Sequence, residues 1–190
     1  MNLKKVFFWQ PKTDFLRLLN LSSLGKKILI VLNYSIWFFL FYVSYRLIRF
    51  QTNIFWQILF ATIAGEIVER LVKSKIYWRR PLFVRHDKLP DGLVKGWYKT
   101  GSFPSGHTIK AVYFLLFILQ YQSSSPTLFL LVTVPLLLFR VLIGFHYPID
   151  LLGGGLIGIV LWQATHTLVA PAYLNDIIKT IFNFVFFIKS

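Results

Sequence analysis

The chain has 190 residues, of which 56% are hydrophobic, 18% are aromatic and only 15% are charged, and its mean hydropathy is +0.60. Soluble domains carry about 25% charged residues, so this composition excludes a water-soluble globular domain and a disordered chain. The absence of cysteine excludes disulfides, thiolate metal ligands and a cysteine nucleophile. The net charge of +14 favours anionic lipid head groups or a phosphorylated substrate as partners, and not nucleic acid.

The first 25 residues alternate basic, aromatic and polar positions, as in Lys4-Lys5 followed by Phe7-Phe8-Trp9. This stretch is too polar to span a bilayer, and it lacks the apolar core and small-residue cleavage site of a signal peptide. We predict that residues 1–25 form a segment at the membrane interface, apolar on one side and attracted to anionic lipid on the other.

Five apolar segments follow, each long enough to cross a hydrocarbon layer of about 30 Å. They lie at about 27–48, 52–72, 106–122, 127–144 and 149–168. The sequence therefore predicts an all-α, polytopic transmembrane helix bundle with about five spans.

The tail, 172–190, interrupts its apolar positions with polar ones and predicts a second interfacial helix, with a short sixth span as the alternative. Length leaves no room for a second domain. We predict one integral-membrane domain over 1–190, with a catalytic core at about 52–168.

Basic residues are distributed unevenly between the two faces that five spans imply. The end of the second span, the start of the third, the end of the fourth and the start of the fifth must share one face. All but four of the 21 Lys and Arg residues lie on that face, and the four exceptions are Arg46, Arg49, Lys179 and Lys189.

Cations suited to phosphate recur on this basic face. Lys73, Arg80 and Arg140 combine a point charge with planar guanidinium groups that fit phosphate oxygens. Ser105-Gly106 places free backbone N–H groups at the start of a helix, where anions are favoured, and the glycine allows close approach. These five residues are our candidate phosphate ligands.

Two histidines and one carboxylate on the same face can divide the work of phosphoryl transfer. One histidine, His146 or His107, can attack phosphorus while the other protonates the departing oxygen. Asp150 follows His146 by four residues, one helical turn if the fifth span begins early enough, and can hold its imidazole in one tautomer. An ionisable residue at the edge of an apolar span is a functional candidate by default.

The order and spacing of these clusters resemble the signature of the type 2 phosphatidic acid phosphatase family, which shares its core with vanadium haloperoxidases. The family pattern is Lys-x6-Arg-Pro, then Pro-Ser-Gly-His, then Ser-Arg-x5-His-x3-Asp. The matching positions are Lys73, Arg80 and Pro81; Pro104, Ser105, Gly106 and His107; and Arg140, His146 and Asp150. Phe139 stands where the family usually has Ser. Family members typically have six spans, and we expect the N-terminal interfacial segment to replace a full first span here.

The resemblance implies specific roles. His146 would attack phosphorus to give a phosphohistidine, Asp150 would orient it, and His107 would protonate the leaving oxygen before water hydrolyses the intermediate. The phosphate ligands Lys73, Arg80, Ser105, Gly106 and Arg140 would stabilise the developing charge. The family requires no metal and no other cofactor, and the sequence offers no clustered carboxylates or His/Cys ligand set.

The leading hypothesis is a membrane-embedded, metal-independent phosphatase acting on a lipid phosphate or pyrophosphate, with the substrate's tails left in the bilayer. Phosphatidic acid, phosphatidylglycerophosphate, undecaprenyl pyrophosphate and a lipid A phosphate all remain open as substrates, and the oligomeric state is open too. The alternatives are a lipid phosphotransferase with the same intermediate and a non-catalytic binder or transporter of anionic lipids. A haloperoxidase is excluded by the spans.

Two arguments disagree about sidedness. The positive-inside rule places the basic face in the cytoplasm, whereas prokaryotic relatives usually place the active face outside the cytoplasmic membrane. Since phosphate binding explains much of the excess charge, we adopt the family expectation: a prokaryotic inner membrane protein with its active site on the periplasmic face.

Other conspicuous residues carry weaker expectations. Lys110, one turn after His107, is a candidate for assisting phosphate binding. We expect Glu66 and Glu69 to pair with Arg70 or Lys73, with a position facing the pocket as the alternative. We assign no catalytic role to His86 or His166, treat Trp97 and Tyr98 as interfacial anchors, and expect Gly153, Gly154 and Gly155 to serve close helix packing.

Overall fold

The computed structural model describes residues 3–20, 22–85 and 100–188, and every regular element in these ranges is an α-helix. In chain order the helices are α1 (Leu3–Phe7), α2 (Phe15–Asn20), α3 (Ser23–Phe50), α4 (Ile54–Ser74), α5 (Pro81–Arg85), α6 (Gly106–Tyr121), α7 (Pro126–Leu142), α8 (Pro148–Thr165) and α9 (Ala172–Val185). The prediction of an all-α fold is confirmed.

The five long helices α3, α4, α6, α7 and α8 coincide with the five apolar segments to within a few residues at each end. Two of them, α3 with 28 residues and α8 with 18, are long and apolar enough to cross a membrane, and α7 is a shorter apolar helix. The number of five spans stays a prediction.

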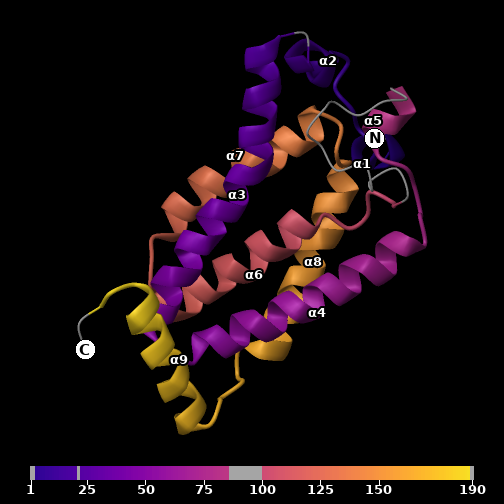
Figure 1. Cartoon of the computed structure of the whole chain (residues 1–190). Helices are drawn as coiled ribbons and strands as arrows, with labels where there is room; N and C mark the ends of the chain where they lie inside the picture. Colours follow the sequence, from indigo (N-terminus) through magenta and orange to yellow (C-terminus); the bar gives the residue numbers. More distant parts are fainter. Residues whose placement is uncertain (1–2, 21, 86–99, 189–190) are drawn as a thin grey trace.

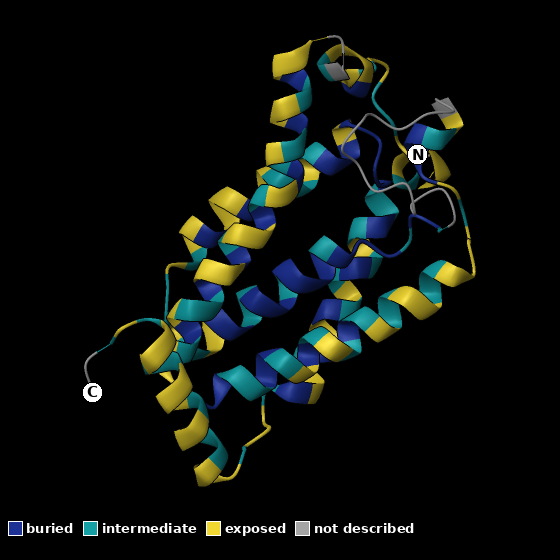
Figure 2. Cartoon of the chain, in the orientation of Figure 1, coloured by how far each residue is buried: buried dark blue, intermediate teal, exposed yellow. Residues whose placement is uncertain are grey.

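The bundle is built around α6, which runs through the middle of the other long helices (Figure 1). Most residues of α6 are buried, whereas α3, α4 and α9 turn exposed faces outward (Figure 2). The main core joins α6 to α3 and α4 through large apolar side chains, among them Leu40, Leu47, Ile58, Ile109, Tyr113 and Phe117.

Glycines allow α8 to lie directly against α6. A β-carbon on Gly154 would come within 2.6 Å of the Ser105 carbonyl oxygen, and one on Gly158 within 2.6 Å of the Ile109 carbonyl oxygen. Any larger residue would push the helices apart. The glycines of α8 therefore serve close packing, as expected, and this contact brings the start of α6 next to the start of α8.

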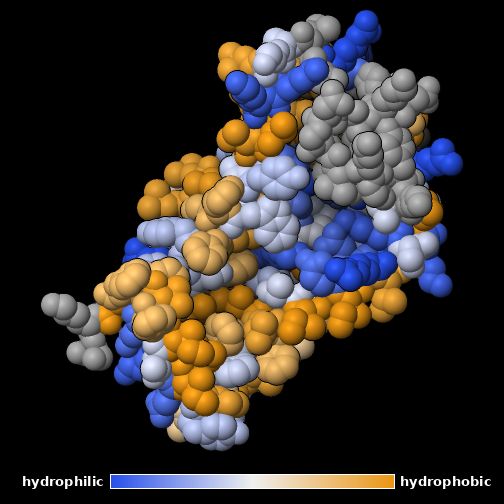
Figure 3. Space-filling view, in the orientation of Figure 1, coloured by the Kyte–Doolittle hydropathy of each residue, from blue (hydrophilic) through white to orange (hydrophobic). Residues whose placement is uncertain are grey.

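The two ends of the chain behave differently. The N-terminal segment folds into α1 and α2, and Leu16 of α2 is buried in a second small core with Leu29, Leu82, Ile143 and Phe145. In contrast, no residue of α9 is buried, although Phe182 stacks on Tyr45 of α3 with ring centroids 5.4 Å apart. Hydrophobic side chains predominate over α9, while hydrophilic ones gather towards the end where the N terminus lies (Figure 3).

Candidate active site

The turn between α7 and α8 positions His146. After α7 ends, the backbone N–H groups of Phe145 and His146 both donate to the Arg140 carbonyl oxygen, at 2.9 and 3.3 Å. Gly144 makes this turn possible because its φ of +83° is a backbone conformation that residues other than glycine rarely adopt. The Leu82 N–H donates to the Gly144 carbonyl oxygen at 2.8 Å, so α5 is fixed to the same turn.

Asp150 lies in the first turn of α8 and faces His146. Its Oδ2 is 3.3 Å from His146 Nδ1 and also accepts from the Tyr147 N–H at 2.8 Å, while Oδ1 accepts from Trp78 Nε1 at 2.9 Å. The helix begins only at Pro148, so the two residues do not share a helical turn, yet they meet because the capping contact with Tyr147 fixes the carboxylate. Both side chains are buried.

The second motif is joined to the third by a backbone hydrogen bond. Ser105 is the N-cap of α6, and its N–H donates to the Asp150 carbonyl oxygen at 3.0 Å. His107, in the first turn of α6, packs edge-on against Trp37 of α3 with ring centroids 5.1 Å apart. The start of α6 therefore lies beside the start of α8, as span parity predicts.

Two arginines of the motifs are buried at this end of the bundle. Arg80 is 2% exposed and donates to the Phe145 carbonyl oxygen at 3.2 Å; Arg140 is 3% exposed and donates to Asn33 Oδ1 at 2.9 Å. Burial lowers the pKa of Arg80 to about 10, against the attraction of Asp150 and Glu69. Arg80 therefore keeps its positive charge at neutral pH.

Lys73 and Lys110 each form an ion pair with a glutamate of α4. Lys73 pairs with Glu69 on the preceding turn of α4, as expected. Lys110 lies 2.7 Å from Glu66 and 3.8 Å from Glu69, so Glu66 pairs across to α6 instead of with Arg70 or Lys73. The difference arises because α4 and α6 pack side by side, which the sequence does not reveal.

Burial and charge keep His146 neutral. Desolvation, reinforced by the positive charges of Arg80, Arg140 and Lys73, lowers the pKa of His146 well below its ordinary value, and a hydrogen bond to the Ser102 backbone opposes this with a smaller effect. A neutral imidazole retains the lone pair that a nucleophile needs.

Several buried polar atoms at this end have no hydrogen-bond partner within the described residues. They include Ser105 Oγ, His107 Nε2 and Arg140 Nε. Unpartnered buried atoms also occur away from these motifs, at Trp56 Nε1, Ser123 Oγ and Asn175 Oδ1. Here they accompany buried cations, and His107 lies within electrostatic range of Arg140, His146, Lys110 and Lys73. Such polar groups are suited to bind the oxygens of an anion.

The structure thus gathers all eight candidate residues at one end of the bundle: His107, His146, Asp150, Lys73, Arg80, Ser105, Gly106 and Arg140. His166 does not join them, since it stacks on Trp162 at the end of α8, with ring centroids 4.4 Å apart. His86, Trp97 and Tyr98 lie outside the described residues.

Sequence reasoning missed the residues that support this site from outside the motifs. Phe8 packs on both Trp78 and Tyr147, with ring centroids 5.1 Å apart in each case, and Gln10 Nε2 donates to the Tyr147 hydroxyl at 3.2 Å. The lone amide Asn33 in an otherwise apolar segment was the one available signal for the contact with Arg140.

Comparison with known proteins adds one finding. The family model described as the PAP2 superfamily matches residues 55–174, which is more than half of the chain and includes all eight candidate residues. No curated protein and no solved structure matches the chain. The chain therefore belongs to the PAP2 superfamily, the type 2 phosphatidic acid phosphatase family of phosphatase-type hydrolases that its motifs resemble.

Proposed function

We propose that this protein is a membrane-embedded phosphatase that hydrolyses a lipid phosphate or pyrophosphate through a phosphohistidine on His146. The observation that carries the proposal is the buried pair of His146 and Asp150, surrounded by the positive charges of Arg80, Arg140 and Lys73. A neutral imidazole beside three cations is arranged to meet an anionic phosphorus centre.

In the proposed mechanism, Asp150 accepts from Nδ1 of His146 and leaves Nε2 to attack phosphorus. The new N–P bond forms as the P–O bond to the lipid breaks, and His107 donates its proton to the departing oxygen. Water then attacks the phosphohistidine, His107 takes a proton from that water, and inorganic phosphate leaves with His146 restored. Asp150 stabilises the positive charge on His146 during both steps.

The phosphoryl oxygens have several donors within this arrangement. Ser105 Oγ and Arg140 Nε are buried without partners in the described chain, and the amide groups at the start of α6 face the same end of the bundle. Donors already fixed in place cost no reorganisation as charge develops on the phosphoryl group. With Lys73, Arg80 and Gly106, these residues form the proposed phosphate site.

A groove beside the site supports a lipid as the substrate. Its volume is about 270 Å³, and its walls are mostly apolar residues of α3, α4 and α6, with Lys110 at one end. Trp37, which lines this groove, also contacts His107 and lies under the Lys110 ammonium at 5.1 Å. An apolar tail in the groove would therefore leave its phosphate next to His107.

Membrane embedding rests on the apolar helices α3 and α8 and on the exposed apolar residues of the outer helix faces. The prokaryotic inner membrane and a periplasmic active site belong to the same proposal, as does a single domain over 1–190 with its core at about 52–168. A site at one end of the bundle would receive a head group while tails stay in the hydrocarbon layer.

The test is phosphate release by the detergent-purified protein from a panel of lipid phosphates and pyrophosphates in the presence of EDTA. Wild type is expected to release phosphate, and His146→Ala is expected to lose at least 10³-fold in turnover, on the order expected for a removed nucleophile. Trapping a ³²P-labelled, acid-labile protein adduct in wild type alone would identify the intermediate. Equal release by both proteins would overturn the proposal, and transfer of label to a second lipid would instead identify a phosphotransferase.

A further inference from the structure

One acidic residue occupies the cationic site without belonging to any of the three motifs. Glu69 lies on α4, one turn before Lys73, and its Oε1 forms an ion pair with the Lys73 ammonium. Its other oxygen, Oε2, is 3.8 Å from the Lys110 ammonium. The Glu69 side chain is only 17% exposed, so its charge is largely removed from solvent.

The surroundings of Glu69 are those proposed for the phosphoryl group. Its carboxylate lies against Gly106, where an added β-carbon would overlap with both carboxylate oxygens. It is also close enough to Arg80 and Arg140 to attract both guanidinium groups. Glu69 thus touches or faces four of the proposed phosphate-binding residues.

The other carboxylate of the site is differently engaged. The two carboxylate oxygens of Asp150 form hydrogen bonds with His146, Tyr147 and Trp78. Those contacts hold it behind His146, whereas the contacts of Glu69 are with groups that would hold substrate. A phosphoryl group bound to Lys73 and Gly106 would need the space and the positive charges that Glu69 uses. Two anions in this site would repel each other, which costs binding free energy.

We propose that Glu69 is an internal competitor that occupies the anion site when no ligand is bound and keeps weakly binding anions out of it. This inference rests on the proposed function, because it assigns the same site to the substrate's phosphate. A ligand binds only by displacing the Glu69 carboxylate from Lys73, so the contribution of that ion pair is subtracted from every binding energy.

Whether a ligand can displace Glu69 at a given concentration depends on how strongly it binds, and therefore on its charge. A phosphomonoester carries about −1.5 to −2 at neutral pH, whereas a phosphodiester carries a single negative charge. The displacement cost is the same for both ligands, so a tightly binding monoester or pyrophosphate still fills the site at low concentration, whereas a weakly binding diester does not. In a bilayer composed mostly of diester lipids, Glu69 would keep the site from being filled by the surrounding head groups.

Inorganic phosphate and dimethyl phosphate are suitable probes, because one represents the monoester charge and the other the diester charge. Their dissociation constants would be measured by ligand protection against thermal unfolding of the detergent-purified full chain. Glu69→Gln keeps the side-chain shape and removes the charge. Glu66→Gln is the matched control, since Glu66 pairs with Lys110 but is 42% exposed.

We expect Glu69→Gln to bind inorganic phosphate about tenfold more tightly than wild type, on the scale of one lost ion pair. Dimethyl phosphate should gain by a similar factor, because both ligands displace the same carboxylate, and it should then occupy the site at concentrations that leave the wild-type site without ligand. Glu66→Gln should change both constants by less than about threefold. Weaker or unchanged phosphate binding by Glu69→Gln would overturn the proposal, because a residue that only positions Lys73 would give that result.

Two further arms separate this inference from the proposed function. If Glu69→Gln does not fold, Glu69→Asp retracts the carboxylate from Gly106 and is expected to tighten phosphate binding in the same direction. Turnover by wild type and His146→Ala would be measured on the same preparations. Tighter phosphate binding without any turnover would support the competitor and contradict the phosphatase, whereas His146-dependent turnover with unchanged binding would contradict the competitor alone.

Discussion

The two ends of the helix bundle both bury polar side chains, but they use them differently. Around the start of α4, the Asn53 amide donates to Leu168 and accepts from Ala170, both at 2.8 Å, and Gln57 donates to His166 and accepts from Tyr121. At the other end, Ser105, His107 and Arg140 bury polar atoms without partners in the described chain. The first, closed network satisfies the amides of Asn53 and Gln57 within the chain and ties it together, whereas the second group combines unpartnered polar atoms with buried charge.

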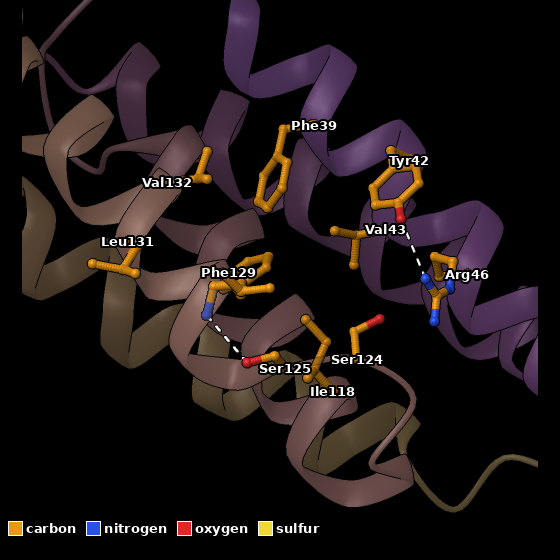
Figure 4. Close-up of a pocket in the computed structure, with 11 residues that line it drawn as sticks. Phe39, Tyr42, Val43, Arg46, Ile118, Ser124, Ser125, Phe129, Leu131 and Val132 are labelled. Atoms are coloured by element: carbon orange, nitrogen blue, oxygen red, sulfur yellow. Dashed lines mark hydrogen bonds between the residues drawn. The ribbon is translucent and has the colours of Figure 1, made fainter.

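The arginines of the two ends differ in the same way. Arg46 and Arg49, at the end of α3, are exposed and each donates to a tyrosine hydroxyl one turn back, at 3.2 Å. Arg80 and Arg140 are buried. The cavity of about 490 Å³ beside Arg46 is walled mainly by apolar residues of α3, α6 and α7, and its Ser125 hydroxyl already caps α7 (Figure 4). Buried charge with unused donors, not the number of charges, therefore distinguishes the candidate site.

The largest effect is expected from Asp150→Asn. The amide keeps the size of the side chain but cannot stabilise a positive imidazole, so turnover should fall on the order of 10³- to 10⁴-fold. Steady-state phosphate release checks this, with circular dichroism to show that the helices persist. A loss below tenfold would mean that Asp150 serves mainly to cap α8.

Exchanging one arginine at each end tests the comparison directly. Arg140→Gln should reduce kcat/KM roughly 10²- to 10³-fold, because it removes a buried charge from the proposed phosphate site. Arg46→Gln, on an exposed helix end, should leave kcat/KM within about twofold of wild type. Comparable losses in both variants would show that the basic residues act through general electrostatics.

The closed network should govern stability and not catalysis. Gln57→Leu leaves the Tyr121 hydroxyl and the His166 carbonyl without their partner, which costs about 1–3 kcal/mol of unfolding free energy. Turnover per folded molecule should be unchanged. Thermal unfolding in detergent, alongside activity below the transition, measures both quantities, and a selective loss of turnover would contradict the division between the two ends.

The smallest effect concerns pH. Burial, Arg80, Arg140 and Lys73 lower the pKa of His146, so the nucleophile stays neutral as the pH falls and the acidic limb of kcat/KM should lie well below pH 6.5. Arg80→Gln removes one positive neighbour, raises the pKa of His146 and should move this limb to higher pH by up to about one unit. Profiles of both proteins with one substrate cancel the substrate's own ionisation; a limb that stays in place would show that Arg80 does not act on His146.

The sequence by itself predicted the long helices, because apolar runs of this length between charged and polar turns favour α-helices over other structures. It also predicted that the eight candidate residues lie at one end of the bundle, since the motifs lie at helix ends whose order along the chain places them on one face. The same patterns could not define the number of spans. A helix such as α4 carries charged residues near one end, and its sequence does not say whether it crosses the hydrocarbon layer completely.

Only the tertiary structure decided the contacts made by residues far apart in the chain. Glu66 pairs with Lys110 because α4 packs against α6, Asn33 meets Arg140 because α3 crosses α7, and Phe8 covers Trp78 because the N-terminal segment folds back. Hydrophobic periodicity says which face of a helix is buried but not against what. Glu69 is an example. In the sequence it is one charged residue near the end of a helix, and only its position against Gly106 led to the proposal that it competes with the substrate's phosphate.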